Sequence, residues 1–348
     1  MTKKFIYLII VFSFVLFFVF NSPKVQDKLI IVAAKKLSQT PDFFENYDDD
    51  LKLVICGSRS PLPSSGRAET CVLVQAGNDI YLFDIGNGGA TNLSDYRVPW
   101  QKLKSVFISH FHSDHFSDLN DIHLQTWIGG QRKEKLKVYG PEGIDIITRG
   151  FELANSFDYS YRTEHHGNDI APLIYAGFNP IVFKDYEEIK TPTNDFKVIP
   201  FSVNHSPIDL AYGFKIIYKD RSIVISGDTI INDNLKKYSQ DVDVLVHDVM
   251  SPHLLNMLSD NVDNEVGKII FKDVTTYHAP VDEVGKLAVE LNVGHLIAYH
   301  AVPAPTNRLM EKVFYRNMDK ILNNWTPSND GTYVILPTNS EEIIIGNL

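Results

Sequence analysis

The sequence predicts an α+β fold in which two β-sheets are covered on their outer faces by helices. Short apolar runs separated by turn residues begin at Leu51 and continue almost to the end of the chain. Helical segments interrupt these runs without the strict strand–helix alternation that would predict a doubly wound parallel sheet. With 348 residues, 44% of them apolar and 22% charged, the chain has the size and composition of a large globular protein.

The strands are expected where apolar residues form runs of about four to eight between turn signals. Gly77-Asn78-Asp79 is expected to join the second and third of these runs as a hairpin turn. The expected strands cover residues 51–56, 71–75, 80–84, 106–109, 137–139, 197–203, 211–218, 222–226, 244–246, 295–298 and 332–336.

Helices are expected where apolar residues recur at helical spacing, over residues 118–128, 143–154, 281–291 and 307–321. The Gly-rich stretch 86–89 is expected to be a flexible loop that opens a further helical segment. Residues 151–195 are irregular and rich in aromatic and acidic residues, so we expect an inserted lid or substrate-facing segment there.

The N-terminus predicts a membrane anchor. Lys3 and Lys4 precede an uncharged apolar run, residues 5–20, which is shorter than the span of about 20 residues that a membrane requires. It resembles the apolar part of a signal peptide, but no small-residue cleavage site follows it. An uncleaved signal anchor over residues 1–24 is favoured, a cleaved signal peptide is the alternative, and either puts the catalytic domain in the periplasm or outside the cell.

A tether over residues 25–50 and one large domain over residues 51–348 complete the expected domain organisation. The formal net charge of −10 argues against a nucleic-acid partner, because a phosphate backbone is held largely by Lys and Arg. Cys56 and Cys71 are the only cysteines, and each lies in an apolar run. Buried free thiols are favoured, and one disulfide bridge is the alternative.

The densest chemistry lies in the stretch Ser109–His115, which holds three histidines and one aspartate directly after an apolar run. Neutral imidazoles and carboxylates are ligands that zinc, iron and manganese accept. With donors one residue apart and two more adjacent, this loop can serve two metal ions. Four later residues also follow apolar strands, where a rigid scaffold can direct side chains into one site: His205, Asp228, His278 and His300.

This pattern resembles the metallo-β-lactamase superfamily, whose H-x-H-x-D-H signature is met at residues 110–115 and whose later His, Asp and His follow in the same order. Over most of residues 51–337 the resemblance implies a four-layer αββα sandwich with metals at one edge between the sheets. It implies seven ligands: His110, His112 and His205 for one metal, Asp114, His115 and His300 for the second, and Asp228 as a bridge between them.

The implied cofactor is a pair of divalent ions, with zinc favoured and manganese or iron as alternatives. Two cations about 3.5–4 Å apart need a shared anionic ligand, and a hydroxide between them is a nucleophile at neutral pH. Because most ligands are neutral histidines, the site keeps a net positive charge, which suits an anionic ester.

Within the superfamily, the sequence is most similar to the branch of ribonuclease Z and the zinc-dependent arylsulfatases. Residues 57–61 resemble the first loop of that branch, and residues 82–86 resemble the strand and turn that follow it. The stretch 277–280 stands where the branch has a His-containing catalytic element, which implies that His278 is the general acid. The alternative is that His278 orients a metal ligand. Asp114 and His278 are thus the predicted catalytic residues.

Two departures from the family pattern are visible. Residues 246–249 resemble a His-Glu-Ala-Thr element, but Asp248 stands where a Glu is expected, which puts its supporting role in doubt. Asp118 stands where many relatives carry Gly, and we expect its carboxylate to support a ligand imidazole.

A second polar cluster, residues 158–167, includes Arg162, His165 and His166. Arg162 is a candidate clamp for a sulfate or phosphate group, with the two histidines as substrate contacts. The alternative is an exposed polar turn in which Arg162 pairs with Asp158 or Glu164. The remaining histidines singled out, His123, His253 and His295, are expected to be structural.

The sequence therefore favours a dinuclear metal-dependent hydrolase of small phosphate or sulfate esters. The alternative is a ribonuclease Z-type endoribonuclease that processes tRNA 3′ ends, and a non-catalytic metal-binding or redox protein is the third hypothesis. A β-lactamase is less favoured because Asp228 replaces the Cys typical of that activity. The expected partners are a small anionic ester, the membrane through the N-terminal segment and, as a further possibility, a second copy of the chain.

Overall fold

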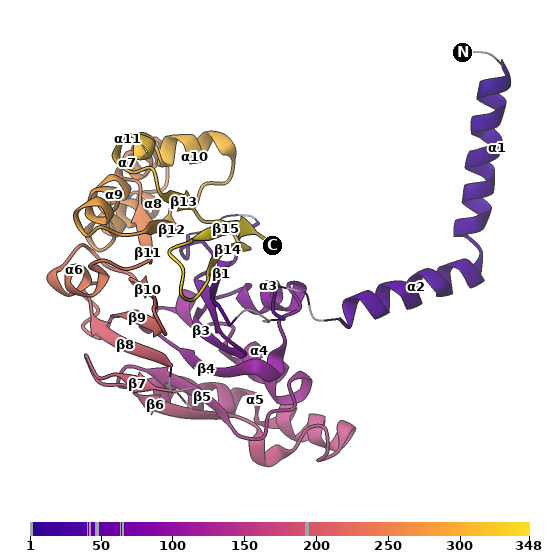
Figure 1. The fold of residues 1–348 in the computed structure, drawn as a ribbon, viewed down its shortest axis with the longest axis horizontal. Coiled ribbons are helices and arrows are strands. Elements are labelled where there is room, and N and C mark those ends of the chain that lie inside the picture. Colours follow the sequence, from indigo (N-terminus) through magenta and orange to yellow (C-terminus); the bar gives the residue numbers. More distant parts are fainter. Residues whose placement is uncertain are drawn as a thin grey trace. The chain divides into compact units, whose positions relative to one another are not determined.

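The computed structural model describes residues 3–39, 41, 43–45, 49–62, 64, 66–191 and 195–348 (Figure 1). The chain divides into two compact units, Met1–Glu45 and Asn46–Leu348. The first unit contains two helices, α1 (Lys3–Phe20) and α2 (Pro23–Leu37). Part of the expected tether, residues 40, 42 and 46–48, lies outside the described residues.

The structure of the first unit contradicts the predicted membrane anchor. Within the described ranges, no helix is long and apolar enough to cross a membrane. Helix α1 has 18 residues and begins with Lys3 and Lys4. At about 1.5 Å per residue its uncharged part is about 24 Å long, short of a hydrocarbon core of about 30 Å. The prediction that the catalytic domain is anchored or exported into the periplasm or exterior is therefore wrong.

The second unit is built on two sheets. The order of the first is β15-β14-β1-β2-β3-β4-β5-β6, and that of the second is β13-β12-β11-β10-β9-β8-β7. The strands of the first sheet are β1 (Leu51–Gly57), β2 (Cys71–Ala76), β3 (Asp79–Ile85), β4 (Leu103–Phe107), β5 (Leu136–Gly140), β6 (Phe178–Val182), β14 (Thr332–Leu336) and β15 (Ile344–Asn347). Those of the second are β7 (Ile189–Lys190), β8 (Phe196–Ser202), β9 (Tyr212–Tyr218), β10 (Arg221–Ile225), β11 (Val244–Met250), β12 (His295–Val302) and β13 (Trp325–Pro327).

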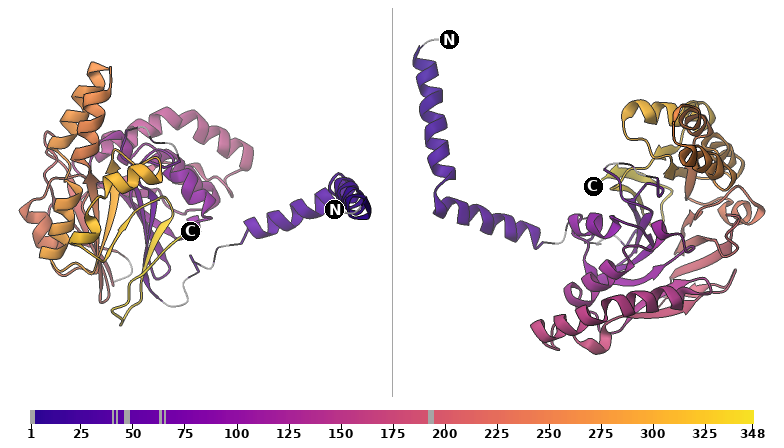
Figure 2. Two further views of the ribbon diagram at one scale, coloured as in Figure 1. Left: turned by 90° about the horizontal axis from the view of Figure 1, so that it is seen from above. Right: turned by 180° about the vertical axis from the view of Figure 1, so that it is seen from behind.

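The helices lie outside the two sheets, so the layers run helix, sheet, sheet, helix (Figures 1 and 2). On the side of the first sheet are α3 (Gly89–Asp95), α4 (Leu119–Leu124, continued by the π-helical turn Gln125–Gly129) and α5 (Ile144–His166). On the side of the second are α6 (Asp233–Ser239), α7 (Pro252–Asn261), α8 (Glu265–Asp273), α9 (Val281–Glu290), α10 (Arg308–Phe314) and α11 (Met318–Ile321). The predicted two-sheet architecture is confirmed.

The main core lies between the sheets and is rich in aromatic rings. Tyr81 of β3 stacks on Phe196 of β8 with ring centroids 4.1 Å apart, and Phe83 stacks on Phe107 at 4.8 Å. A second core joins the outer face of the second sheet to α9, whose Val284 and other apolar residues are buried there. Burying both faces of the strands fixes their register and holds the strand ends in place.

The expected irregular segment over residues 151–195 is partly wrong. Helix α5 continues to His166, twelve residues past the predicted end. Its exposed face carries Leu153 and Phe157 where polar residues would mark a surface helix, so the sequence pattern did not reveal this part of the helix. Helices α7 and α8 were also not predicted from the pattern. They begin at N-caps, Ser251 and Asn264, whose side chains accept hydrogen bonds from the first turn of each helix.

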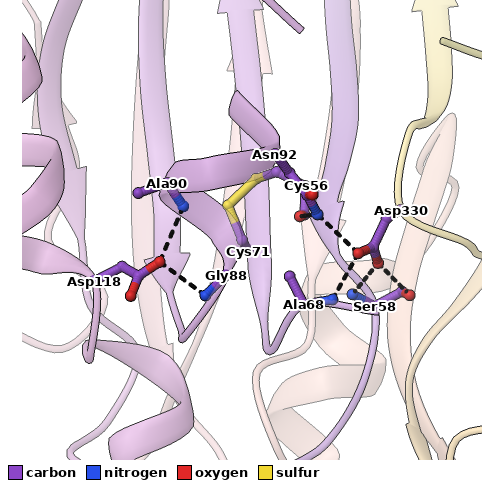
Figure 3. The surroundings of a disulfide bond; sticks show 9 residues. All are labelled: Cys56, Ser58, Ala68, Cys71, Gly88, Ala90, Asn92, Asp118 and Asp330. Atoms are coloured by element: carbon purple, nitrogen blue, oxygen red, sulfur yellow. Dashed lines mark hydrogen bonds between the residues drawn. A yellow bond between two sulfur atoms is a disulfide. The ribbon is translucent and has the colours of Figure 1, made fainter. Parts of the chain in front are cut away.

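The cysteines form a disulfide between β1 and β2, so the favoured expectation of free thiols is wrong (Figure 3). In the antiparallel pairing, Ile55 is opposite Val72 and Gly57 is opposite Cys71. Cys56 is therefore the extra residue of a β-bulge, and its Cα lies 4.9 Å from that of Cys71. Sequence alternation alone does not reveal such a bulge.

Candidate metal centre

The histidine-rich loop follows β4 and is packed closely against the turn after β3. Gly86 in that turn leaves no room for a side chain, since a Cβ there would lie 2.1 Å from the carbonyl oxygen of Asp114. The loop forms a short 3-10 turn, Ser113–His115, in which Asp114 and His115 are buried. The close approach to Gly86 thus fixes the depth at which the loop presents its ligands.

Two further β-bulges direct side chains into the same region. In β12, Tyr299 is opposite Asp248 and Ala301 is opposite Val249, which leaves His300 as an extra residue with φ of 43°. In β3, Asp84 is likewise an extra residue, with φ of 56°. A left-handed conformation costs free energy for any residue with a Cβ and is retained mainly at functional positions.

All seven predicted metal ligands come together in two groups that share Asp228, and within each group the ligand atoms lie within 4.8 Å of one another. The first group is His110, His112, His205 and Asp228; the second is Asp114, His115, Asp228 and His300. In the first, His112 Nδ1 lies 3.0 Å from His110 Nε2 and 3.3 Å from His205 Nε2. In the second, Asp228 Oδ2 lies 3.3 Å from both His115 Nε2 and His300 Nε2.

The donor set fits divalent metal ions on its own chemistry. Asp228 Oδ1 is buried and has no hydrogen-bond partner among the described residues. A buried polar atom without a partner costs free energy, and a bound ion would satisfy this oxygen. Imidazole nitrogens and carboxylate oxygens are ligands that zinc accepts, so the cluster is suited to binding divalent metals.

Burial and neighbouring charges shift the pKa values of residues in the cluster. Burial by itself raises the pKa of Asp228, but His300 and His115 beside it outweigh this effect and hold the pKa well below its ordinary value. Burial and the neighbouring His115 hold the pKa of His110 well below its ordinary value. An ionised carboxylate and a neutral imidazole are the forms that bind metal, so both shifts favour occupancy.

A ligand-supporting carboxylate that sequence reasoning missed is Asp84. Its Oδ2 lies 2.8 Å from His115 Nδ1, and its two oxygens accept hydrogen bonds from the backbone N–H and hydroxyl of Ser109 at 2.7 and 2.8 Å. This contact orients the ring so that Nε2 faces the cluster. The aspartate was visible at the end of a predicted strand, but strand alternation gave no sign that it faces the histidines.

Asp118 does not support a ligand imidazole, so that expectation is wrong. Its carboxylate accepts hydrogen bonds from the backbone N–H groups of Gly88 and Ala90, at the start of α3 (Figure 3). Asp330 has a comparable structural role: it accepts hydrogen bonds from Ser58 and Asn92, among others, and so holds the loop after β1. Both carboxylates therefore stabilise local backbone structure and contact none of the histidines of the cluster.

His278 lies beside the cluster and is held by Asp248. Its Nδ1 is 2.8 Å from Asp248 Oδ2, and Asp248 is fully buried. His247 Nδ1 lies 3.0 Å from the other oxygen of the same carboxylate. The doubt that the shorter Asp248 could reach a partner is therefore removed, because it contacts two histidines. Together with Asp228, Asp248 and His278 also form a third group of closely spaced potential ligands.

The cluster opens into a cavity of about 230 Å³. Its lining includes His112, Asp114, Asp228 and His278 together with apolar residues. The hydroxyl of Ser60, which also lines the cavity, is buried without a hydrogen-bond partner among the described residues. The cavity therefore puts both metal groups and His278 in reach of one small ligand.

The structure does not bring Arg162, His165 and His166 to this cavity. They lie in the last two turns of α5, and none of them lines the pocket. Arg162 Nε donates to Asp158 at 2.7 Å, one helical turn earlier, which is the exposed pairing considered as the alternative. His123 is buried and accepts a hydrogen bond from the Gly177 N–H, and His295 contacts Thr326, as expected of structural histidines.

The chain is similar to several ribonucleases in sequence. It is 29% identical over 259 residues to ribonuclease Z of Mycobacterium bovis (strain BCG / Pasteur 1173P2), covering 73% of this chain and 87% of that protein. The match to ribonuclease Z of Mycolicibacterium gilvum (strain PYR-GCK) is 27% over 256 residues, covering 73% and 85%.

Solved structures share the fold. The metallo-β-lactamase fold protein YhfI from Bacillus subtilis superposes with a TM-score of 0.59 at 19% identity, and the short form of human tRNase Z with 0.56 at 17%. Each comparison covers 82% of this chain and 99% of the other. Zn(2+)-bound PqqB from Methylobacterium extorquens superposes with a TM-score of 0.54 at 14% identity, covering 81% and 99%.

A family model described as "Anti-Pycsar protein Apyc1" matches residues 51–256, which contain the histidine loop, His205 and Asp228. With its two-sheet fold, its His and Asp cluster and its hydrolase relatives, the chain is a metal-dependent hydrolase of the metallo-β-lactamase fold that acts on ester bonds, and it belongs to the Anti-Pycsar protein Apyc1 family.

Proposed function

We propose that this protein hydrolyses phosphodiester bonds with two divalent metal ions, of which zinc is the favoured choice. The observation that carries the proposal is that Asp228 belongs to both four-residue groups while the two groups share one cavity. His110, His112 and His205 would hold one ion and Asp114, His115 and His300 the other, with Asp228 between them. When bound, such a pair of ions neutralises the charge of a phosphodiester and acidifies a water molecule.

The protein's own residues supply the remaining steps. Asp84 keeps the His115 ring in its orientation, and the carbonyl oxygen of Tyr277 accepts a hydrogen bond from His205 Nδ1 at 3.1 Å. Asp248 contacts Nδ1 of His278 and so holds the ring in place, which leaves the other ring nitrogen to give a proton to the leaving oxygen. Because His278 lines the cavity beside Asp114 and Asp228, a single bound ester can reach both the ions and the acid.

Two substrate classes use this chemistry. An RNA phosphodiester, as in tRNA 3′ processing, is favoured by the relatives named ribonuclease Z. A small phosphodiester is the second candidate, and the small volume of the cavity favours it. No observation on the site favours a sulfate ester over either of them.

The test is metal analysis of the full-length protein followed by parallel assays on precursor tRNA, bis(4-nitrophenyl) phosphate and 4-nitrophenyl sulfate. We expect bound divalent metal, turnover of a phosphodiester and loss of turnover after chelation. Cleavage of tRNA at its 3′ end assigns the RNA substrate, and turnover of the small diester alone assigns the second candidate. Protein that carries its metal but turns over no phosphodiester contradicts the proposal.

The role of His278 is tested separately. His278→Ala should lower kcat while metal content stays intact, and His253→Ala, at an exposed histidine on α7, should change neither. The slowing should be about 100-fold or more, as expected for loss of a general acid. Loss of metal from His278→Ala would instead make this residue a support of the metal centre.

A further inference from the structure

Two chemically different sets of residues line the cavity at the metal cluster. The polar set includes the metal-site residues and His278. The apolar set, called here the apolar wall, includes Leu62, Ile270, Val274, Tyr277 and Val302. Among the described residues that line the cavity there is no Lys or Arg.

The apolar wall is continuous with the catalytic segment of the chain. Ile270 lies in α8, Val274 begins the short 3-10 helix Val274–Thr276, and Tyr277 and His278 follow directly. The Tyr277 ring stands edge-on to the ring of His205, with centroids 5.1 Å apart. A substrate group beside the proton donor therefore also lies beside the wall.

Most residues of the apolar wall pack in or against a buried core cluster. Val274 and Val302 are buried in a core cluster with Met250 and Leu255, and Leu62 and Tyr277 pack against it. Leu62 lies in the loop after β1. There Arg59 donates a hydrogen bond to the carbonyl oxygen of Ser60 and forms an ion pair with Glu69 at 3.1 Å. The wall is thus a preformed surface.

Ile270 differs from the rest of the wall because 42% of its surface is exposed although it faces the cavity. An exposed apolar side chain beside a binding site gains free energy when a ligand covers it. The absence of a cation in the described lining means that a second charged group on the substrate would remain uncompensated there.

We infer that the apolar wall is a binding subsite for one uncharged, apolar ester group of the substrate. The protein would thus select monoanionic diesters that carry a flat, apolar substituent over diesters with only small or charged substituents. This inference rests on the proposed function, because it assumes that the ester's phosphate lies at the metal cluster. The apolar wall would discriminate between ester groups, whereas the metal cluster would bind the phosphate group that all phosphodiesters share.

Calorimetric titration of the zinc-loaded full-length protein with diphenyl phosphate and dimethyl phosphate tests this subsite. Both ligands carry one negative charge, so the comparison keeps the charge constant and changes the ester groups that can cover the wall. We expect diphenyl phosphate to bind at least about tenfold more tightly, as one buried aromatic group allows. Equal affinity for the two ligands, or no binding of diphenyl phosphate, overturns the subsite.

A matched pair of variants tests whether the apolar wall causes the preference for diphenyl phosphate. Ile270→Asn should remove most of the preference, while Ile269→Asn should retain it. Ile269 is the adjacent residue on α8, is 58% exposed and does not line the cavity. Thermal unfolding of both variants checks that they are folded. If the two variants reduce the preference equally, the wall is not the cause, and the inference is wrong.

Failure of the subsite and failure of the proposed function give different results. Turnover of bis(4-nitrophenyl) phosphate, measured on the same samples, reports on the function. Turnover without a preference for diphenyl phosphate contradicts the subsite alone. A preference that Ile270→Asn removes, without turnover of any phosphodiester, contradicts the function and leaves the subsite standing.

Discussion

Replacing Asp84 by Asn tests how far the metal centre depends on a residue that binds no metal itself. The carboxylate contacts His115 Nδ1 at 2.8 Å and accepts two hydrogen bonds from Ser109. Asn keeps the size of the side chain and tolerates the left-handed backbone, since φ is 56° here. If His115 binds metal through Nε2, its Nδ1 carries a hydrogen, and the Asn amide would present a second donor to it.

The expected loss follows from that contact. Removing a carboxylate partner from a metal-binding His typically weakens metal affinity by about 10- to 100-fold, or about 1.4–2.7 kcal/mol. Zinc affinity is measured by competition with a chromogenic chelator, and thermal unfolding shows that the variant is folded. Asp118→Asn is the matched control, because Asp118 also accepts two hydrogen bonds but from the backbone of Gly88 and Ala90.

We expect Asp118→Asn to lower stability while leaving zinc affinity unchanged. Zinc binding by Asp84→Asn that equals that of the wild type would refute the reasoning. Equal weakening of zinc binding in both variants would refute it as well, because the loss would then report general destabilisation. Asp84 would in that case be a structural partner of Ser109 only.

Three further predictions concern stability and the loop geometry. Reduction of the Cys56–Cys71 disulfide, whose cysteines are 15 residues apart, should lower the free energy of unfolding by about 3 kcal/mol in urea denaturation, and a double Cys→Ala variant should not respond to reductant. Burial lowers the pKa of His123 to about 3, so protonation favours the unfolded chain as pH falls below about 6.5. Between pH 7 and pH 5 this residue should cost about 2 kcal/mol of stability, and that part of the pH dependence should be missing from His123→Gln. Gly86→Ala should displace the histidine loop and weaken zinc binding in the chelator assay, whereas Gly150→Ala, with no atom within 4 Å of the added Cβ, should stabilise α5 by about 0.5–1 kcal/mol in denaturation.

The seven clustered residues could be singled out from the sequence because they stand in two kinds of recognisable context. One is a dense loop, residues 110–115, and the other is the polar residue that ends a buried strand, as with His205 and Asp228. Apolar runs also predicted the strands, since burial between two sheets leaves a clear composition signal. The geometric grouping of the seven residues agrees with the order that the family resemblance implied.

Side chains at backbone irregularities were less predictable from strand alternation. Cys56, Asp84 and His300 are each the extra residue of a bulge. One inserted residue reverses which face a side chain occupies, so alternation alone did not reveal the disulfide of Cys56 or the contact of Asp84 with His115. Asp118 shows the reverse case, in which a carboxylate near the histidines in sequence serves a helix start instead.

The membrane prediction followed the composition of the N-terminal segment although its apolar run is short for a bilayer. Composition alone marked residues 5–20 as apolar, and the remaining question was whether the segment could span a bilayer. The exposed apolar face of α5 misled in a similar way, because Leu153 and Phe157 obscured the amphipathic pattern that identifies a surface helix. Residues 5–20 are hydrophobic but too few to span a bilayer, and Leu153 and Phe157 are hydrophobic but exposed.

The division of the ligands between the two sheets has a consequence for local opening of the molecule. Residues 110–115 follow a strand of the first sheet, whereas His205, Asp228 and His300 belong to strands or strand ends of the second. Ions bound to both sets would link the sheets across the edge of their shared core. Separation of the sheets at that edge would then require release of metal, so amide hydrogen exchange in β4 and β12 should slow together as zinc is added.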